Sequence, residues 1–411
     1  MALPALARNG RLREGWEQRT LKAGPLPKAD LWIQAASGGE AYLAWELLRR
    51  LPDALPQNCR PRILVTTFTA QGLGVLKQAA ELLADRVELL PAWFPFDLPG
   101  RMEEALAAVS PRAVVLLETE LWPGLMAACR RQGVHALVLN ARMTEKSRKG
   151  YAHMPGFWKA LSPRRVMAVS PDDAARFADL FPDAAVSVMP NIKFDRLDFS
   201  AAPKAKDLGR LLPEGETAPA PPFVVLGSVR KQEEPEVLEI VKGLLERVPG
   251  VVVGLFPRHM ERVRAWEQML SKAGLPFARR SAGTTAQPGS VILWDAFGEL
   301  GAAFGLARAC FLGGSLADLG GQNFLEPLAH GVVPVIGPSW SNFAWVGAEI
   351  FGSGLARREA DRQGVLTSLA ALATAPPPRA AVLEEAERYA KSRRGGAAAA
   401  CQAVAEYLIC G

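Results

Sequence analysis

Short apolar runs alternate with longer amphipathic segments along the first half of the chain. The runs are continuous rather than alternating, so they predict buried strands, at 31–35, 62–67, 87–90, 113–117, 135–139 and 166–169. The segments between them predict helices at 40–51, 71–83, 102–108 and 123–132. Apolar strands separated by helices are typical of a parallel sheet covered on both faces. The first half is therefore predicted to be a doubly wound α/β domain.

The same pattern restarts after residue 220. Strands are predicted at 223–227, 251–256, 291–294, 309–312 and 333–336, and residues 201–222, which contain five prolines, are predicted to be a linker. We therefore expect an N-terminal domain at 1–200 and a C-terminal domain at 223–411. The Ala-rich tail at 380–408 is expected to end the second domain, and whether it also crosses back to brace the first stays open. Two such domains predict a ligand site in the cleft between them, at the carboxyl ends of the strands.

Composition narrows the class of protein. Of 411 residues, 49% are hydrophobic and 22% charged, which is the balance of a globular protein. No apolar run approaches the roughly 18 residues that span a bilayer, and arginines at 8, 11 and 13 interrupt any signal-peptide layout, so a cytoplasmic location is expected. The net charge of +6 is too small to indicate nucleic-acid binding. The five cysteines form no C-x-x-C pair and there are only four histidines, so no metal site is predicted.

The first 28 residues are basic, with six Lys or Arg against two Glu. This mixture suits the surface of an anionic membrane, and it also suits a solvated helix. Both interpretations stay open at this point.

Missing motifs exclude several enzyme classes. The chain has no G-x-x-x-x-G-K-[ST], no H-E-x-x-H and no G-x-S-x-G. A D-x-D triplet is also absent, which argues against a metal-dependent sugar-nucleotide transferase. A metal-free site would have to neutralise phosphate with Arg, Lys and helix N-termini.

Three glycine-bearing turns follow predicted strands. In the first, Ser37-Gly38-Gly39-Glu40 opens a helix, and Glu40 either stabilises the helix dipole or acts in catalysis. In the second, the segments 311–315 and 320–327 are predicted to present free N–H groups to a phosphate, with Glu326 accepting a ribose hydroxyl; a plain connector is the alternative. In the third, Arg258 follows Pro257 and is expected to hold a phosphate.

Charged residues also follow strands elsewhere. Glu118 and Glu120 come directly after the apolar run 113–117, so they mark the rim of the sheet; the alternative is a plain helix N-terminus, with Thr119 as its cap and Pro123 in its first turn. Lys193 lies where the first domain closes and is expected to direct a cation into the cleft. Glu299 adds a carboxylate to the rim of the second domain.

Read in order, these segments resemble the family of 3-deoxy-D-manno-octulosonic acid (Kdo) transferases, which move Kdo from CMP-Kdo to a lipid A precursor. The matching pieces are R-L-R-E-G-W-E-Q-R (11–19), W-I-Q-A-A-S-G-G-E (32–40), P-F-D-L-P-G (95–100), E-T-E-L-W-P (118–123), N-A-R (140–142), N-I-K-F-D (191–195), P-R-H-x-E-R (257–262), D-A-F-G-E-L (295–300) and G-G-S…G-G-Q-N-F-L-E-P (313–327). The resemblance covers roughly residues 11 to 345, and E-T-E-L-W-P and G-G-x-N-x-L-E-P are its most specific pieces.

The resemblance implies a GT-B fold of two Rossmann-like domains facing each other across a cleft, no metal, and an inverting single displacement. It implies that Glu40 is the general base and that Glu118 and Lys193 stabilise the transition state. The donor-binding residues implied are Pro257, Arg258, Phe297, Gly298, Glu299, Gly314, Ser315, Asn323, Phe324, Leu325 and Glu326. The first domain would bind the lipid acceptor and the second CMP-Kdo, on the cytoplasmic side of the inner membrane, with the chain attached peripherally.

Several positions depart from the family pattern. Gln322 stands where His is usual, Gly38 where an aliphatic residue is usual and Gly124 where Asn is usual, while Ser228-Val229-Arg230-Lys231 replaces S-T-H-E. Only residues 1–7 precede the basic stretch, where an apolar anchor is usual. Two alternatives therefore stay open: a GT-B transferase that uses another sugar nucleotide, and a non-catalytic nucleotide-binding paralogue.

Overall fold

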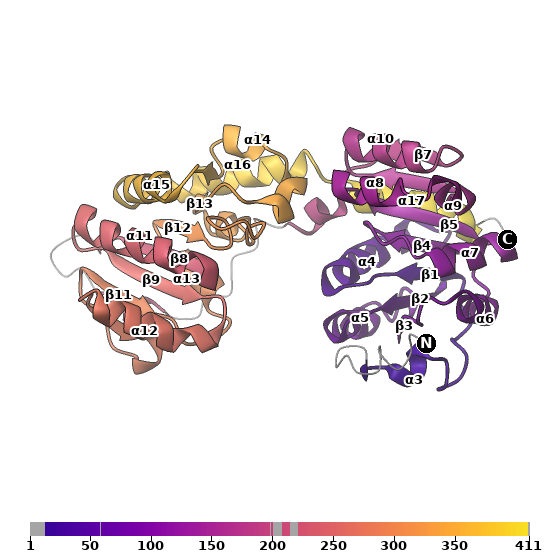
Figure 1. Cartoon of the computed structure of the whole chain (residues 1–411), viewed down its shortest axis with the longest axis horizontal. Helices are drawn as coiled ribbons and strands as arrows, with labels where there is room; N and C mark the ends of the chain where they lie inside the picture. The colour runs from indigo at the N-terminus through magenta and orange to yellow at the C-terminus, as the bar shows by residue number, and fades with distance from the viewer. Residues whose placement is uncertain (1–12, 58, 198, 200–207, 214–220, 410–411) are drawn as a thin grey trace. The chain divides into compact units, whose positions relative to one another are not determined.

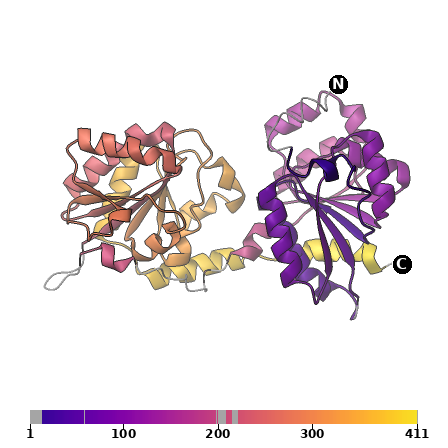
Figure 2. The same ribbon diagram turned by 90° about the horizontal axis from the view of Figure 1, so that it is seen from below.

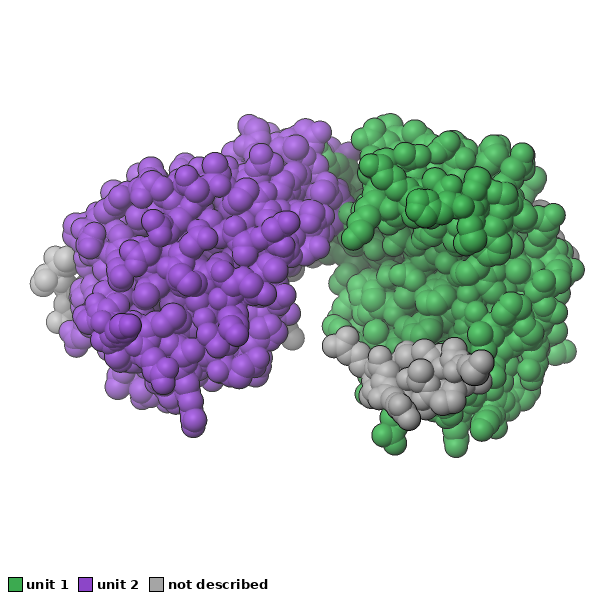
Figure 3. Space-filling model, viewed as in Figure 1, with its two compact units in different colours: residues 1–197, 393–411 green, residues 198–392 purple. Residues whose placement is uncertain are grey.

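The structure, a computed structural model, describes residues 13–57, 59–197, 199, 208–213 and 221–409. The chain divides into two compact units, residues 1–197 with 393–411 (unit 1) and residues 198–392 (unit 2), coloured separately in Figure 3. The last residues thus belong to the first unit, whereas the sequence assigned all of 223–411 to the second domain. Most of the predicted linker at 201–222, and residues 1–12 of the basic N-terminal segment, lie outside the described residues.

Unit 1 contains a seven-stranded parallel sheet in the order β3-β2-β1-β4-β5-β6-β7 (Figure 1). Its strands are β1 (Leu31–Gln34), β2 (Arg62–Thr67), β3 (Glu88–Trp93), β4 (Ala113–Leu117), β5 (His135–Ala141), β6 (Arg165–Ala168) and β7 (Ala185–Val188). Its helices are α3 (Trp16–Arg19), α4 (Gly38–Arg50), α5 (Ala70–Leu82), α6 (Pro99–Val109), α7 (Pro123–Gln132), α8 (Glu145–Tyr151), α9 (Pro155–Ala160), α10 (Pro171–Leu180) and α17 (Gly396–Ile409), with 3-10 turns η1 (Leu51–Ala54) and η2 (Ile192–Arg196). This is the doubly wound arrangement that the hydrophobic pattern predicts.

Each face of this sheet has its own core. Successive strand residues point to opposite faces, so Leu31 and Ile33 join the core under α4, α5 and α17, while Trp32 joins the core under α6, α7 and α10. All three side chains are fully buried. The continuous apolar strands of the sequence are therefore explained by helices on both sides of the sheet.

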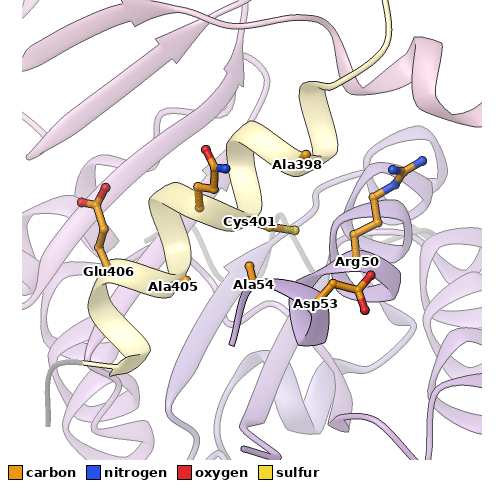
Figure 4. A pocket seen from close by; sticks show the side chains of 8 residues that line it. Arg50, Asp53, Ala54, Ala398, Cys401, Ala405 and Glu406 are labelled. Atoms are coloured by element: carbon orange, nitrogen blue, oxygen red, sulfur yellow. The ribbon is translucent and has the colours of Figure 1, made fainter. Parts of the chain in front are cut away.

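The C-terminal helix α17 is part of unit 1, and Figure 2 shows it, in yellow, among the purple elements of that unit. It packs on α4, η1 and η2, and its alanines enter the same core as Leu31. Cys401 Sγ donates to the carbonyl of Leu47 at 3.2 Å, and at the far end Glu406 pairs with Arg165 at 2.9 Å. A groove of about 760 Å³ lies between α17 and the end of α4 (Figure 4), and its lining includes none of the predicted site residues.

Unit 2 contains a second seven-stranded parallel sheet, in the order β10-β11-β9-β8-β12-β13-β14. Its strands are β8 (Phe223–Val229), β9 (Val252–Pro257), β10 (Phe277–Arg279), β11 (Ser290–Leu293), β12 (Ala309–Leu312), β13 (Pro334–Ile336) and β14 (Arg357–Arg358). Its helices are α11 (Glu234–Arg247), α12 (Val263–Lys272), α13 (Leu300–Leu306), α14 (Glu349–Gly352), α15 (Arg362–Thr374) and α16 (Arg379–Lys391), with 3-10 turns η3 (Gly209–Leu211), η4 (Lys231–Glu233), η5 (Met260–Arg262), η6 (Arg280–Ala282), η7 (Pro327–His330) and η8 (Ser341–Val346). Strand order again reverses between the first strand, β8, and β12.

Two further observations bear on the N-terminal segment and on membranes. Arg19, counted in the sequence as part of a basic surface, is fully buried: it lies over the rings of Phe68 and Trp93 and donates to the carbonyls of Phe68 and Glu14. It therefore anchors α3 to the sheet rather than facing a membrane. Within the described residues, no helix combines the length and the apolarity needed to cross a bilayer.

Candidate active site

The first group of site residues lies where strand order reverses in unit 1. Strands β1 and β4 are hydrogen-bonded neighbours, although β2 and β3 come between them in the sequence. Glu40 follows β1 in the first turn of α4, and Glu118 directly follows β4. Both residues thus leave the carboxyl edge at the topological switch point, where open α/β sheets bind their ligands.

Glu40 is held in place by the turn that starts its helix. Ser37 caps α4 by accepting from the Glu40 amide at 3.4 Å, and the Glu40 carboxylate accepts from the Ala36 amide at 2.6 Å and from Ser37 Oγ at 3.0 Å. Burial, with Glu120 and then Glu118 nearby, raises the pKa of Glu40 from 4.5 to about 7, although the Ala36 N–H opposes the shift. A carboxylate with such a pKa is matched to proton transfer near neutral pH.

Glu118 and Lys193 form an ion pair at this edge. Lys193 Nζ lies 2.5 Å from Glu118 Oε1, and the two side chains are 23% and 17% exposed. Glu118 has φ 56°, a left-handed conformation that a non-glycine residue adopts at some cost. The backbone therefore turns sharply after β4 and directs this carboxylate at the lysine.

Side-chain amides fix the turn that carries Lys193. Asn191 Oδ1 accepts from the Lys193 amide at 3.0 Å, and Asn140 Oδ1 accepts from the Ile192 amide at 2.9 Å. Asn140 is fully buried at the end of β5. The segments N-A-R, N-I-K-F-D and E-T-E-L-W-P, separated in sequence, therefore meet in one place.

The P-F-D-L-P-G segment supports the same site through the carboxylate of Asp97. Asp97 accepts from the amides of Gly124 and Leu125, each at 2.8 Å, and so caps α7 just beyond Glu118 and Glu120. A Cβ at position 124 would lie 2.6 Å from Asp97 Oδ1, so glycine lets this carboxylate approach. Glycine at position 124 therefore leaves room for the Asp97 cap in this chain.

In unit 2, Pro257 ends β9 and Arg258 is exposed just beyond it. The Arg258 amide donates to the carbonyl of Val229 at 2.8 Å, which ties this turn to the end of β8. The guanidinium of Arg258 therefore stands at the carboxyl edge of the second sheet, where it can reach an anionic ligand.

The glycine loop at 313–316 differs from the prediction of free N–H groups. The Gly314 amide donates to Glu233 Oε1 at 2.6 Å, the Leu316 amide to Glu233 Oε2 at 3.4 Å, and the Gly313 amide to the carbonyl of Gly227. Ser315 is fully buried and its Oγ accepts from the Gly337 amide. These groups are directed into the protein because the buried carboxylate of Glu233 already occupies the loop.

The two remaining donor segments approach each other near α13. Glu326 Oε1 lies 3.1 Å from the position of a Cβ on Gly301, so its carboxylate lies on the first turn of that helix. Asn323 is exposed, whereas Phe324 and Leu325, in the same segment, are buried. The predicted residues of this segment therefore divide into two that can reach a ligand and two that support them.

The loop before α13 divides similarly. Phe297 is 75% exposed, and Gly298 has φ 74°, which favours glycine. Glu299 is only 7% exposed, and its carboxylate accepts from Arg280 at 2.6 Å and from Trp294 Nε1 at 2.9 Å. Glu299 therefore braces the loop with its side chain.

Sequence reasoning did not single out Glu233 or Asp195. Both are buried carboxylates whose partners are distant amides: Glu233 binds the loop at 313–316, and Asp195 binds the start of α17. The only available signal was an acid inside a motif, for Asp195, or close to one, for Glu233, and acids are common on any surface.

Three comparisons place these features among known proteins. Residues 11–196 match the family model described as 3-deoxy-D-manno-octulosonic-acid transferase (kdotransferase). A 3-deoxy-D-manno-octulosonic acid transferase of Bordetella pertussis is 31% identical over 92% of this chain and 88% of its own length, and one from Haemophilus influenzae is 31% identical over 83% and 76%. A crystal structure of a glycosyltransferase from Rickettsia africae, only 10% identical, covers 94% of this chain and 100% of its own, with a TM-score of 0.59. This last likeness confirms the predicted α/β fold of the GT-B type.

Proposed function

The chain belongs to the Kdo transferase family, and on this premise we propose that it transfers Kdo from CMP-Kdo to a lipid A precursor in lipopolysaccharide synthesis. The observation that carries the proposal is the group formed by Glu40, Glu118 and Lys193 at the topological switch of unit 1. Transfer would proceed as one inverting displacement, in which an acceptor hydroxyl attacks the anomeric carbon and CMP leaves.

Glu40 is proposed as the general base. The attacking hydroxyl must lose a proton as its oxygen bonds to the anomeric carbon, and a carboxylate with a pKa of about 7 accepts that proton well while staying largely ionised above neutral pH. An ordinary exposed glutamate, with a pKa near 4.3, would be a weaker base.

Lys193 and Glu118 are proposed to stabilise charge in the transition state. The ammonium of Lys193 is suited to the donor carboxylate or to the departing phosphate, and Glu118 holds it in place across 2.5 Å. Glu118 can in turn oppose the positive charge that develops at the anomeric carbon.

The donor is proposed to bind to unit 2. Arg258 would hold the phosphate, Glu326 the ribose hydroxyls and Asn323 a polar edge of the nucleotide, while exposed Phe297 offers an aromatic face. Pro257, Gly298, Glu299, Gly314, Ser315, Phe324 and Leu325 would shape the site through backbone and packing. No metal is invoked, because Arg258 and Lys193 supply positive charge.

We extend the proposal to the membrane, where the acceptor resides. Met154 and Phe157 are 57% and 44% exposed, and the exposed side chains of Lys146, Lys149 and Lys159 accompany them. We call these five residues the basic α8–α9 face. Apolar side chains among lysines suit insertion at the surface of an anionic leaflet.

We propose that this face lies beside the site, with Tyr151 between them. Tyr151, at the end of α8, is close enough to Glu120 for the charge of that carboxylate to add to the effect of burial, which raises the pKa of the tyrosine hydroxyl. The Tyr151 ring also packs edge-on against Trp158 of α9, 4.8 Å between centroids. A lipid headgroup bound at the basic α8–α9 face would therefore lie near Glu40. We propose that this takes place on the cytoplasmic side of the inner membrane.

The proposal is tested by a transfer assay with purified protein, enzymatically generated CMP-Kdo and a tetra-acylated lipid A precursor, followed by mass spectrometry of the lipid. A lipid heavier by one or more Kdo units is the expected result. Turnover with a UDP-sugar instead would favour a different GT-B transferase. CMP binding with no consumption of any donor would indicate a non-catalytic paralogue.

A further inference from the structure

We infer that Asp195 is a positioning residue: it holds the two segments that connect the units against the 3-10 turn that carries Lys193. This inference rests on the proposed function. Asp195 and Lys193 lie in the same 3-10 turn, η2. The Asp195 carboxylate is 1% exposed and accepts from the amides of Gly395 and Ala397, each at 2.9 Å. It thus provides, from a distant part of the chain, the cap that α17 needs at its N-terminus.

Both places where the chain passes between the units lie next to this carboxylate. The chain leaves unit 1 at Leu197 and returns at Arg393. Arg394 donates to the carbonyl of Leu197, and the next residue, Gly395, donates to Asp195. The segment that leaves unit 1 and the segment that returns to it are therefore hydrogen-bonded to each other next to Asp195.

The contact is close as well as hydrogen-bonded. A Cβ on Gly396 would lie 2.3 Å from the carbonyl oxygen of Pro190 and 2.7 Å from the amide nitrogen of Ile192. The first turn of α17 thus rests on the backbone that leads into Lys193. Any larger residue at 396 would push the helix away from that turn.

A series of fixed contacts therefore runs from the two connections between the units to the ammonium group of Lys193. Asp195 holds α17, Gly396 presses on the backbone at Ile192, and Lys193 reaches Glu118. A 1 Å displacement of a catalytic group can lower a rate about 100-fold. Loosening Asp195 is therefore expected to lower kcat rather than substrate binding.

Two variants test this without touching the lysine or its partner. Asp195→Asn removes one acceptor from the two amides, and Gly396→Ala leaves every hydrogen-bonding group in place but introduces the clash. Gly74→Ala, in α5, is the matched control, because a Cβ there meets nothing within 4 Å. Each full-length variant is assayed for kcat, for KM of CMP-Kdo and lipid, for CMP affinity by calorimetry, and for amide hydrogen exchange.

For Asp195→Asn and Gly396→Ala we expect kcat to fall at least 10-fold. Both KM values and the CMP affinity should stay within about threefold of wild type. Amide hydrogen exchange should become faster at 190–197 and stay unchanged in α6. Gly74→Ala should match wild type. Unchanged kcat, or equal losses in kcat and in CMP affinity, would overturn the inference. Absence of transfer by the wild-type protein would instead defeat the proposed function, and unaltered exchange at 190–197 in both variants would still refute the coupling.

Discussion

Lys193 Nζ and Glu118 Oε1 lie 2.5 Å apart, and the pair joins the turn after β7 to the turn after β4. Both side chains are mostly shielded from water, so removing one charge leaves the other partly buried without its partner. The stability of the pair and its role in transfer can therefore be measured separately.

Lys193→Met and Glu118→Gln are each expected to lower the free energy of unfolding by about 1–3 kcal/mol. The double variant should be more stable than the sum of the single losses implies, because neither charge is then left alone. Urea unfolding of the four proteins measures this. In all three variants kcat should fall at least 100-fold, because that is about the effect of removing one preorganised contact to the transition state. Strict additivity in unfolding would show that the pair does not form in solution.

The rate of transfer should follow the ionisation of Glu40. Burial and then Glu120 raise its pKa to about 7, and the base must be deprotonated, so kcat/KM for the acceptor should rise with pH to a plateau above about 7. Glu120→Gln removes one charge that disfavours ionisation and should move this midpoint to lower pH. A wild-type midpoint near 4.5 would rule out the assigned base.

Glu40→Gln should separate activity from stability. Transfer should be lost while CMP affinity stays within about twofold. A carboxyl whose folded pKa exceeds its unfolded value binds protons more tightly when folded, so wild-type stability decreases as pH rises from about 4.5 to 7. The neutral amide escapes this loss and should be more stable than wild type by up to about 3 kcal/mol at pH 8, and about equal to it at pH 4. Thermal or urea unfolding at both pH values provides the comparison.

Arg258→Ala should weaken binding of CMP by about 2–5 kcal/mol, since the phosphate would be left desolvated in the site without its charged partner. Arg357→Ala, an exposed arginine on the edge strand β14, is a suitable control and should bind the donor normally. Calorimetric titration with CMP measures both. Equal affinities of the two variants would assign the phosphate to another group.

The basic α8–α9 face predicts binding to anionic vesicles. Phe157→Ser and Lys149→Glu should each reduce sedimentation with phosphatidylglycerol vesicles several-fold, because the first removes an inserted ring and the second reverses a charge. Leu82→Ser, which changes a side chain that is 65% exposed on α5, should have no effect. If Leu82→Ser reduced binding as much as Phe157→Ser, the face assigned here would be the wrong one.

The two sheets were predictable because most strands are buried on both sides, and burial leaves a continuous apolar run in the sequence. The strands that prediction missed, β7, β10 and β14, lie at sheet edges, and β14 consists of two exposed arginines. Their side chains are exposed or half-buried, so no continuous apolar run marks them in the sequence.

The residues of the site likewise divide into those that a local sequence pattern marks and those that it does not. Glu118 and Arg258 follow strands directly, and Glu40 lies in the first turn of the helix after a strand, so a local pattern marks all three. Glu233 and Asp195 act on amides 81 and 200 residues away, and no local pattern encodes such a contact. The prediction of free N–H groups in the segment 311–315 was wrong at Gly314 for this reason, since nothing nearby in the sequence shows that Glu233 fills the loop.

Because Glu233 binds the loop from within, the loop is ordered when the protein folds and not when a nucleotide arrives. Little conformational entropy should then be lost on binding, which favours preorganised recognition. A second consequence concerns inhibitors. An anionic compound designed to fill an amide nest at 313–316 would have to displace a buried carboxylate, whereas one that engages the guanidinium of Arg258 and the face of Phe297 meets groups already exposed to solvent.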